Sequence, residues 1–188
     1  MPLSAKDLLS IARDYWRPDK HFNYRPENSP EEEKFLDLWE LELKKMDPWR
    51  AFLRDLGESL PDFNIGNATA TCDACFRCSV YPKAEGKPQP RRWVVVGCLS
   101  ILAPVYTIYG VQYSGTGGER IVGIFDSLPP EMQAPAEIVA KRMEVTFGVS
   151  VLSRELAETP IPLIVEPKEP PNTTLFHALF ISQPERVP

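Results

Sequence analysis

The sequence contains none of the short motifs that identify common enzyme classes. Gly-x-Ser-x-Gly, His-Glu-x-x-His and Asp-x-Asp are all missing, which argues against the familiar serine-hydrolase, zinc-protease and acidic metal-binding signatures. Histidine is scarce, with two copies in 188 residues. His177 lies in an apolar segment, and we interpret it as a packed histidine rather than a catalytic base. The short motifs therefore predict no catalytic residues.

Charge is also missing from a long central stretch, between Arg92 and Glu119. Its first nineteen residues, WVVVGCLSILAPVYTIYGV, are about as many as a helix needs to cross a bilayer. However, Val, Ile and Tyr dominate, Pro104 interrupts the run, and SGTGG follows it at 114–118. We therefore expect two buried strands followed by a hairpin turn, and no membrane span. A phosphate-binding loop is not expected there, because no Gly-Lys-Ser/Thr follows.

Basic residues are outnumbered, with 21 Lys and Arg against 26 Asp and Glu and a net charge of -5. A general nucleic-acid binder would need clustered positive charge, so no nucleic-acid partner is expected. Residues 1–62 hold 14 acidic and 10 basic side chains, so most of the acidic excess lies there. This excess either keeps the surface hydrated or provides a docking face for a basic protein. Residues 1–16 do not resemble a signal peptide, and we expect a cytoplasmic protein.

Three of the four cysteines follow the spacing C-x2-C-x2-C, as Cys72, Cys75 and Cys78. A structural zinc site needs four ligands, and the only candidates for the fourth are distant in sequence: Cys98, His21 and His177. Side chains alternate along a strand, which would place Cys75 opposite Cys72 and Cys78. We therefore favour buried, apolar thiols and expect no metal site and no cofactor. A metal site or a redox pair remains the alternative.

The hydrophobic pattern predicts a single α+β domain over residues 1–188, with a helical part at 1–60 and a sheet with helices at 63–188. Start and stop signals place helices near 4–16, 30–46 and 47–57. The last two are either separate helices or one helix with a break at Asp47. Four antiparallel strands in sequence order are expected within 67–82, 91–102, 105–113 and 120–128. The third of these is apolar on both faces, so it should lie centrally in the sheet. A helix from 130 to 147, a Pro-bounded edge strand at 160–167 and a short helix at 173–180 should follow.

Three segments carry a resemblance to a known group: ATCDACFRCSVYP, WVVVGCLSILAPVYTIYGV and ELAETPIPLIVEPKEPPNTTLFHALF. They resemble myxobacterial cytoplasmic proteins that are similar to the immunity partners of polymorphic toxins. The resemblance implies a non-enzymatic α+β protein that binds one toxin domain and blocks its active site. No residue roles are implied, because immunity families share no catalytic signature.

The absence of catalytic motifs and the acidic N-terminal third agree with such a role, and a basic toxin such as a nuclease would fit by charge. We expect the toxin-binding residues to be acidic and to lie in that third: Asp14, Glu31, Glu32, Glu33, Asp37 and Glu40. One alternative is a metal- or thiol-dependent enzyme or regulator built on Cys72, Cys75 and Cys78. Another is a scaffold or secretion chaperone.

Overall fold

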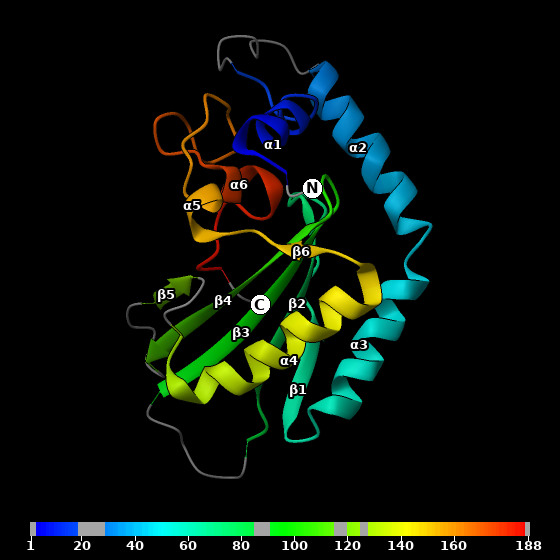
Figure 1. Cartoon of the computed structure of the whole chain (residues 1–188), viewed down its shortest axis with the longest axis vertical. Helices are drawn as coiled ribbons and strands as arrows, with labels where there is room; N and C mark the ends of the chain where they lie inside the picture. Colours follow the sequence, from blue (N-terminus) through cyan, green and yellow to red (C-terminus); the bar gives the residue numbers. More distant parts are fainter. Residues whose placement is uncertain (1–2, 19–28, 85–90, 115–119, 125–127, 187–188) are drawn as a thin grey trace.

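The computed structural model describes residues 3–18, 29–84, 91–114, 120–124 and 128–186 (Figure 1). The fold is α+β, as expected, with helices before and after an open, mainly antiparallel sheet. His21 and most of the expected SGTGG turn lie outside the described residues. Within the described parts of the chain, no helix is both long enough and apolar enough to cross a membrane.

The described residues of the N-terminal third form three separate helices: α1 (Ala5–Ala12), α2 (Pro30–Leu43) and α3 (Asp47–Ser59). Ser4 caps α1 through a reciprocal pair of hydrogen bonds with Asp7, the capping box expected from the sequence. Ser29 caps α2, where its hydroxyl accepts from the backbone N–H of Glu32 at 3.2 Å. The regular part of α1 ends at Ala12, earlier than the expected end near residue 16.

Five antiparallel strands follow one another as neighbours in the sheet: β1 (Phe63–Asn67), β2 (Cys75–Pro82), β3 (Arg91–Ser100), β4 (Val105–Ser114) and β5 (Arg120–Ile124). The meander was expected, but the segment 67–82 was wrongly read as one strand. Residues 68–74 instead connect β1 to β2. A short strand, β6 (Ser150–Val151), adds to β4 in parallel and was not expected.

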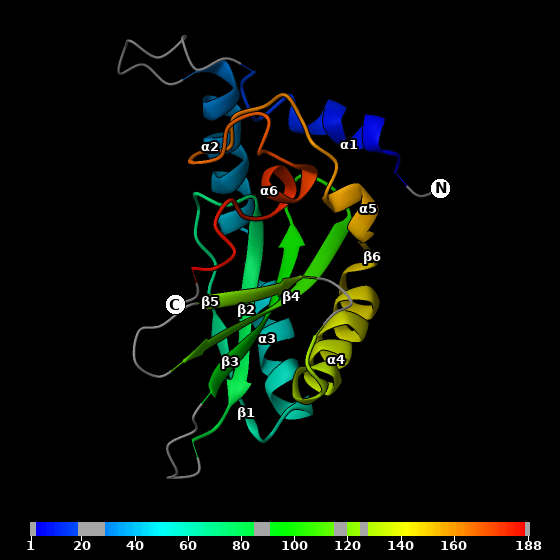
Figure 2. The same ribbon diagram turned by 90° about the vertical axis from the view of Figure 1, so that its left-hand side faces the viewer.

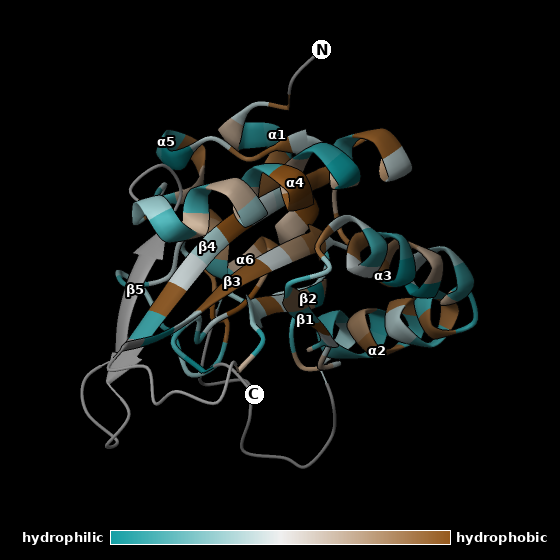
Figure 3. Cartoon of the chain, turned by 90° about the horizontal axis from the view of Figure 1, so that it is seen from below, coloured by the Kyte–Doolittle hydropathy of each residue, from teal (hydrophilic) through white to brown (hydrophobic). Residues whose placement is uncertain are grey.

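Apolar side chains cover both faces of β4, which lies centrally as the sequence predicted. Tyr106 and Ile108 face the side covered by α3 and by α4 (Pro130–Phe147). Val105 and Tyr109 face the opposite side, where α1 and α6 (Leu175–Leu179) pack. Figures 1 and 2 show α3 and α4 against the same side of the sheet, with α1 and α6 gathered near one of its ends. Hydropathy colouring marks β3 as hydrophobic between these layers (Figure 3).

Two glycines allow α4 to lie close to the sheet. A Cβ on Gly97 would come within 2.8 Å of Val139 Cγ1, and a Cβ on Gly110 within 2.8 Å of Met132 Sδ.

Helix α4 ends at Gly148, whose φ of +64° is the left-handed conformation that favours glycine. Both ends of α4 therefore match the boundaries expected from the sequence.

The predicted edge strand at 160–167 is wrong. Among the described residues, this segment makes only two isolated bridges, between Pro160 and Thr174 and between Val165 and Lys168. Three prolines in eight residues remove the N–H groups that a ladder would need. Its apolar side chains are nevertheless buried against the α1 and α6 side of the sheet. The short helix α5 (Arg154–Ala157), just before this segment, was not expected either.

Candidate functional site

Helix α2 is held to the rest of the molecule by a narrow apolar stripe. Phe35 and Trp39 are its buried residues. The Trp39 indole N–H donates to the backbone oxygen of Asp73 at 3.0 Å, and the Phe35 ring lies 4.8 Å from that of Trp16. Because both anchors point the same way, most of the helix circumference is left facing outward along the edge of the molecule (Figure 1).

Three leucines of α2 lie on this outward side. Leu36, Leu41 and Leu43 keep 49%, 53% and 48% of their surface exposed. Full burial of a leucine side chain gives about 1.5–3 kcal/mol relative to exposure, so three half-exposed leucines leave a large favourable contribution unused. Leu36 and Leu43 are seven residues apart and share one side of the helix, whereas Leu41 lies further around it, so the leucines are separate apolar positions on a polar surface.

Acidic residues lie between these leucines. Glu33, Asp37 and Glu40 follow helical spacing along the exposed side of α2. Glu40 pairs with Lys44 at 2.8 Å, and this hydrogen bond and charge lower the pKa of its carboxyl. We call the exposed set the α2 face, and it consists of Glu33, Leu36, Asp37, Glu40, Leu41 and Leu43.

The other acidic residues expected to bind a toxin lie around this face. Asp14 is exposed and reaches α2 through Lys34, with its carboxylate 3.6 Å from the ammonium. Glu32 is exposed near the start of the helix, toward the side of Leu36. Glu31 is only partly exposed and points toward the anchored side. Five of the six residues are thus exposed on or beside α2, and Glu31 is only partly exposed.

A cavity of about 470 Å³ adjoins the α2 face. Leu36 and Glu32 form part of its wall, and Trp16 and Phe35 add aromatic surface. Across the cavity Arg17 pairs with Glu166 at 3.0 Å, which joins the segment after α1 to the segment 160–167. The cavity can accept a side chain from a molecule that lies along α2.

The three clustered cysteines do not meet. Cys75 and Cys78 face opposite sides of the sheet, as strand alternation requires. Cys72 was expected beside Cys78, but it precedes β2 and is exposed in a turn. In the part of the chain that the structure describes, no three His, Cys, Asp or Glu side chains are grouped so that they could hold a metal ion.

The buried thiols are also poor nucleophiles. Burial raises the pKa of Cys78 to about 12, and it raises the pKa of Cys75 well above its ordinary value. A hydrogen bond with Cys98 raises the pKa of Cys75 further. The pKa of Cys72 is raised as well, first by partial burial and then by the charge of Asp73. Since the thiolate is the reactive form, this arrangement favours inert, structural cysteines.

His177 has a structural place at the start of α6. Its Nδ1 accepts a hydrogen bond from the backbone N–H of Thr174 at 3.0 Å, which completes a capping box. Burial, and then the charge of Lys168, lower the pKa of His177 to about 4. The neutral ring is therefore the hydrogen-bond acceptor at neutral pH.

A buried arginine escaped the sequence analysis. The Arg77 Nε donates to the Ala68 backbone oxygen at 2.8 Å, and Nη1 lies 3.8 Å from the Asp73 carboxylate. Burial raises the pKa of Asp73 to about 6, although the charge of Arg77 acts to lower it. The available signal was a charged residue at an interior position of CFRCSV, a run with no other charge. Because Arg77 binds the loop before β2, we assign it to fold stability.

Comparisons with known proteins add no functional information. No protein-family model matches this chain, and neither a curated protein nor a solved structure gives a significant match.

Proposed function

We propose that this chain is an immunity-type inhibitor, which binds and neutralises a cognate toxin domain through the α2 face. One observation carries the proposal: three half-exposed leucines lie among acidic side chains on a helix that is anchored on one side only. Leucines supply contact area, and carboxylates select a partner with a basic surface. A nuclease domain is such a partner, because it needs positive charge to bind nucleic acid.

The size of the surface is compatible with this role. A stable complex buries roughly 800 Å² on each partner. Helix α2 has 14 residues and is therefore about 21 Å long, so it forms one side of such an interface. The adjoining cavity provides an entry for an anchoring side chain, the type of contact that usually dominates binding energy.

The direct test begins with the reading frames beside the gene. The final domain of any secreted neighbour is expressed in bacteria with and without this protein, and cell survival is counted. We expect the neighbour to be toxic and co-expression to restore growth. The proposal fails if no neighbouring product is toxic, or if a toxic neighbour kills equally well in the presence of this protein.

Charge reversal then tests the surface itself. The double variant Glu33→Lys with Asp37→Lys should slow association with the purified toxin about tenfold at low salt and should weaken its salt dependence. The matched control, Glu131→Lys with Glu155→Lys, changes the net charge equally at exposed positions of α4 and α5. Stopped-flow measurements that show equal slowing in both variants would place the interface elsewhere.

A further inference from the structure

A second hollow of about 460 Å³ lies between α4, β4 and the segment after β6. Helix α4 packs on the sheet through long side chains, which include Met132, Val139 and Met143. One turn apart along α4, Ala136 and Ala140 border the hollow instead. Because alanine side chains are short, space remains between this part of α4 and the residues around Leu152.

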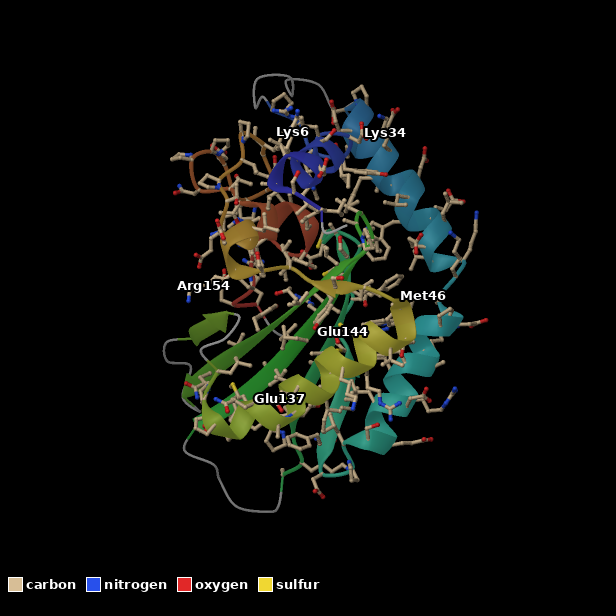
Figure 4. The ribbon with its side chains drawn as sticks, viewed as in Figure 1. Lys6, Lys34, Met46, Glu137, Glu144 and Arg154 are labelled. Carbon is tan, nitrogen blue, oxygen red and sulfur yellow. The ribbon has the colours of Figure 1, made fainter. Side chains whose placement is uncertain are left out.

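The walls of the hollow are mainly apolar. Ile108 of β4, Leu128 and Leu152 form them together with the two alanines of α4. Charged side chains stand at different elements around this space: Glu137 and Glu144 come from α4 and Arg154 from α5 (Figure 4). An apolar hollow with few polar groups is the usual form of a small-molecule site.

Several of the hydrogen-bond donors beside the hollow are already engaged. The Tyr106 hydroxyl donates to Glu144 at 2.7 Å, and the Gln133 side-chain amide donates to the Leu128 backbone oxygen at 3.1 Å. Arg154 donates to Glu158 at 3.0 Å. A ligand that accepted a hydrogen bond from Tyr106 or Gln133 would compete with these contacts.

The carboxylate of Glu137 can still accept a hydrogen bond from a ligand. Among the described residues it makes no ion pair or hydrogen bond, although Lys141 lies one turn further along α4. Glu144 and Glu158 add negative charge nearby, against the positive charges of Arg154 and Lys141. The local balance is therefore negative and favours a cation.

From these contacts we infer that the hollow binds a primary ammonium group carried on an apolar chain. The ammonium pairs with Glu137, and the chain lies along Ala136, Ala140, Ile108 and Leu152. This ligand class satisfies the free acceptor and covers the apolar walls, and it leaves the existing hydrogen bonds in place. The inference is independent of the toxin-binding role, because no residue of the α2 face borders this hollow.

Three ligands of the same length test the inference on the purified protein: hexylammonium, hexanol and hexanoate. Calorimetric titration should give a Kd of about 1 mM for hexylammonium, an affinity within reach of a ligand of this size. Hexanol should bind about fivefold more weakly, because it lacks the charge that pairs with an exposed carboxylate. Hexanoate should not bind. No binding of hexylammonium overturns the inference, and equal binding of hexanol or hexanoate overturns the ammonium assignment.

Variants then locate the site. Glu137→Gln should weaken hexylammonium about fivefold, and Glu131→Gln, which removes the same charge from the first turn of α4, should change the Kd less than about twofold. Ala140→Leu should fill the hollow and weaken binding of both hexylammonium and hexanol more than tenfold, with its thermal unfolding measured as a check of folding. Hexylammonium binding that is unchanged by Glu137→Gln, or by a folded Ala140→Leu, places the site elsewhere.

Discussion

The contact between α4 and the sheet gives a quantitative prediction at Gly97. An alanine Cβ there would lie 2.8 Å from Val139 Cγ1, 2.9 Å from Met143 Cε and 3.0 Å from Cys78 Sγ. Ordinary contacts between such atoms are about 3.5–4.0 Å. Met143 can move its flexible end, but Val139 is branched next to the helix backbone and has little freedom. The helix must therefore shift outward or the strand must bend.

Overpacking of this kind costs about 1–3 kcal/mol. We expect Gly97→Ala to lower the free energy of unfolding by about 2 kcal/mol, which corresponds to a fall in Tm of roughly 4–8 °C for a chain of this size. Urea unfolding followed by circular dichroism, together with thermal unfolding, measures both quantities. The m-value should not change, because the surface exposed on unfolding stays nearly the same.

Gly57 provides the matched control. It lies within α3, and the nearest atom to an added Cβ is Ile65 Cγ1 at 3.9 Å, an ordinary contact. Gly57→Ala should therefore stabilise the protein by about 0.5–1 kcal/mol, since alanine is the better helix former. If Gly97→Ala is as stable as the parent protein, α4 does not approach the sheet as closely as described, and the argument from Gly97 and Gly110 is refuted.

Two titrating groups should change stability with pH in opposite directions. The pKa of Asp73 is raised to about 6 on folding, so the folded state holds this proton more tightly, and stability falls as pH rises from 4 to 6. Over this pH range the free energy of unfolding, measured with urea, should fall by about 2 kcal/mol less in Asp73→Asn than in the parent protein, a value reduced for partial solvent screening. If the free energy of unfolding depends on pH equally in both proteins, the burial argument is refuted. The pKa of His177 is lowered to about 4 on folding. The neutral ring therefore contributes fully to the free energy of unfolding above pH 6.5, and this contribution is lost as pH falls toward 4. His177→Gln keeps an acceptor for the Thr174 N–H. Its free energy of unfolding should fall by about 1–2 kcal/mol less than that of the parent protein over that range. Equal acid sensitivity of the two proteins would contradict this role.

Local signals were sufficient for most helices and strands. Ser29 and Pro30 at the start of α2 and Gly148 after α4 act within one helical turn, so their effect can be seen in a short window of sequence. The alternation around β4 likewise predicted that both of its faces are covered. Local signals failed at 160–167, where an apolar run resembles a strand although its prolines cannot donate to a ladder.

The two proposed sites were predicted to different degrees. The acidic residues of the α2 face were identified from charge alone, but the three exposed leucines beside them were not predicted as part of a binding surface. Which leucines stay exposed depends on the direction in which Phe35 and Trp39 anchor α2, and that direction is set by distant contacts with Trp16 and Asp73. The hollow beside α4 left no sequence signal. It arises because a segment that begins 12 residues after Ala140 crosses near this helix, and only the tertiary structure brings them together.

The position of α2 has a consequence for how a partner would act on this fold. Trp39 holds the helix through the backbone oxygen of Asp73, and Asp73 lies beside the buried Arg77 that binds the loop before β2. A molecule bound along α2 therefore touches a helix that is tied to the sheet on its concealed side, so binding requires little ordering of the helix itself. The hollow beside Glu137 depends instead on α4 and the segment after β6. Because the two sites use different anchors, a change in α2 should leave amine binding intact, and a filled hollow should leave toxin binding intact.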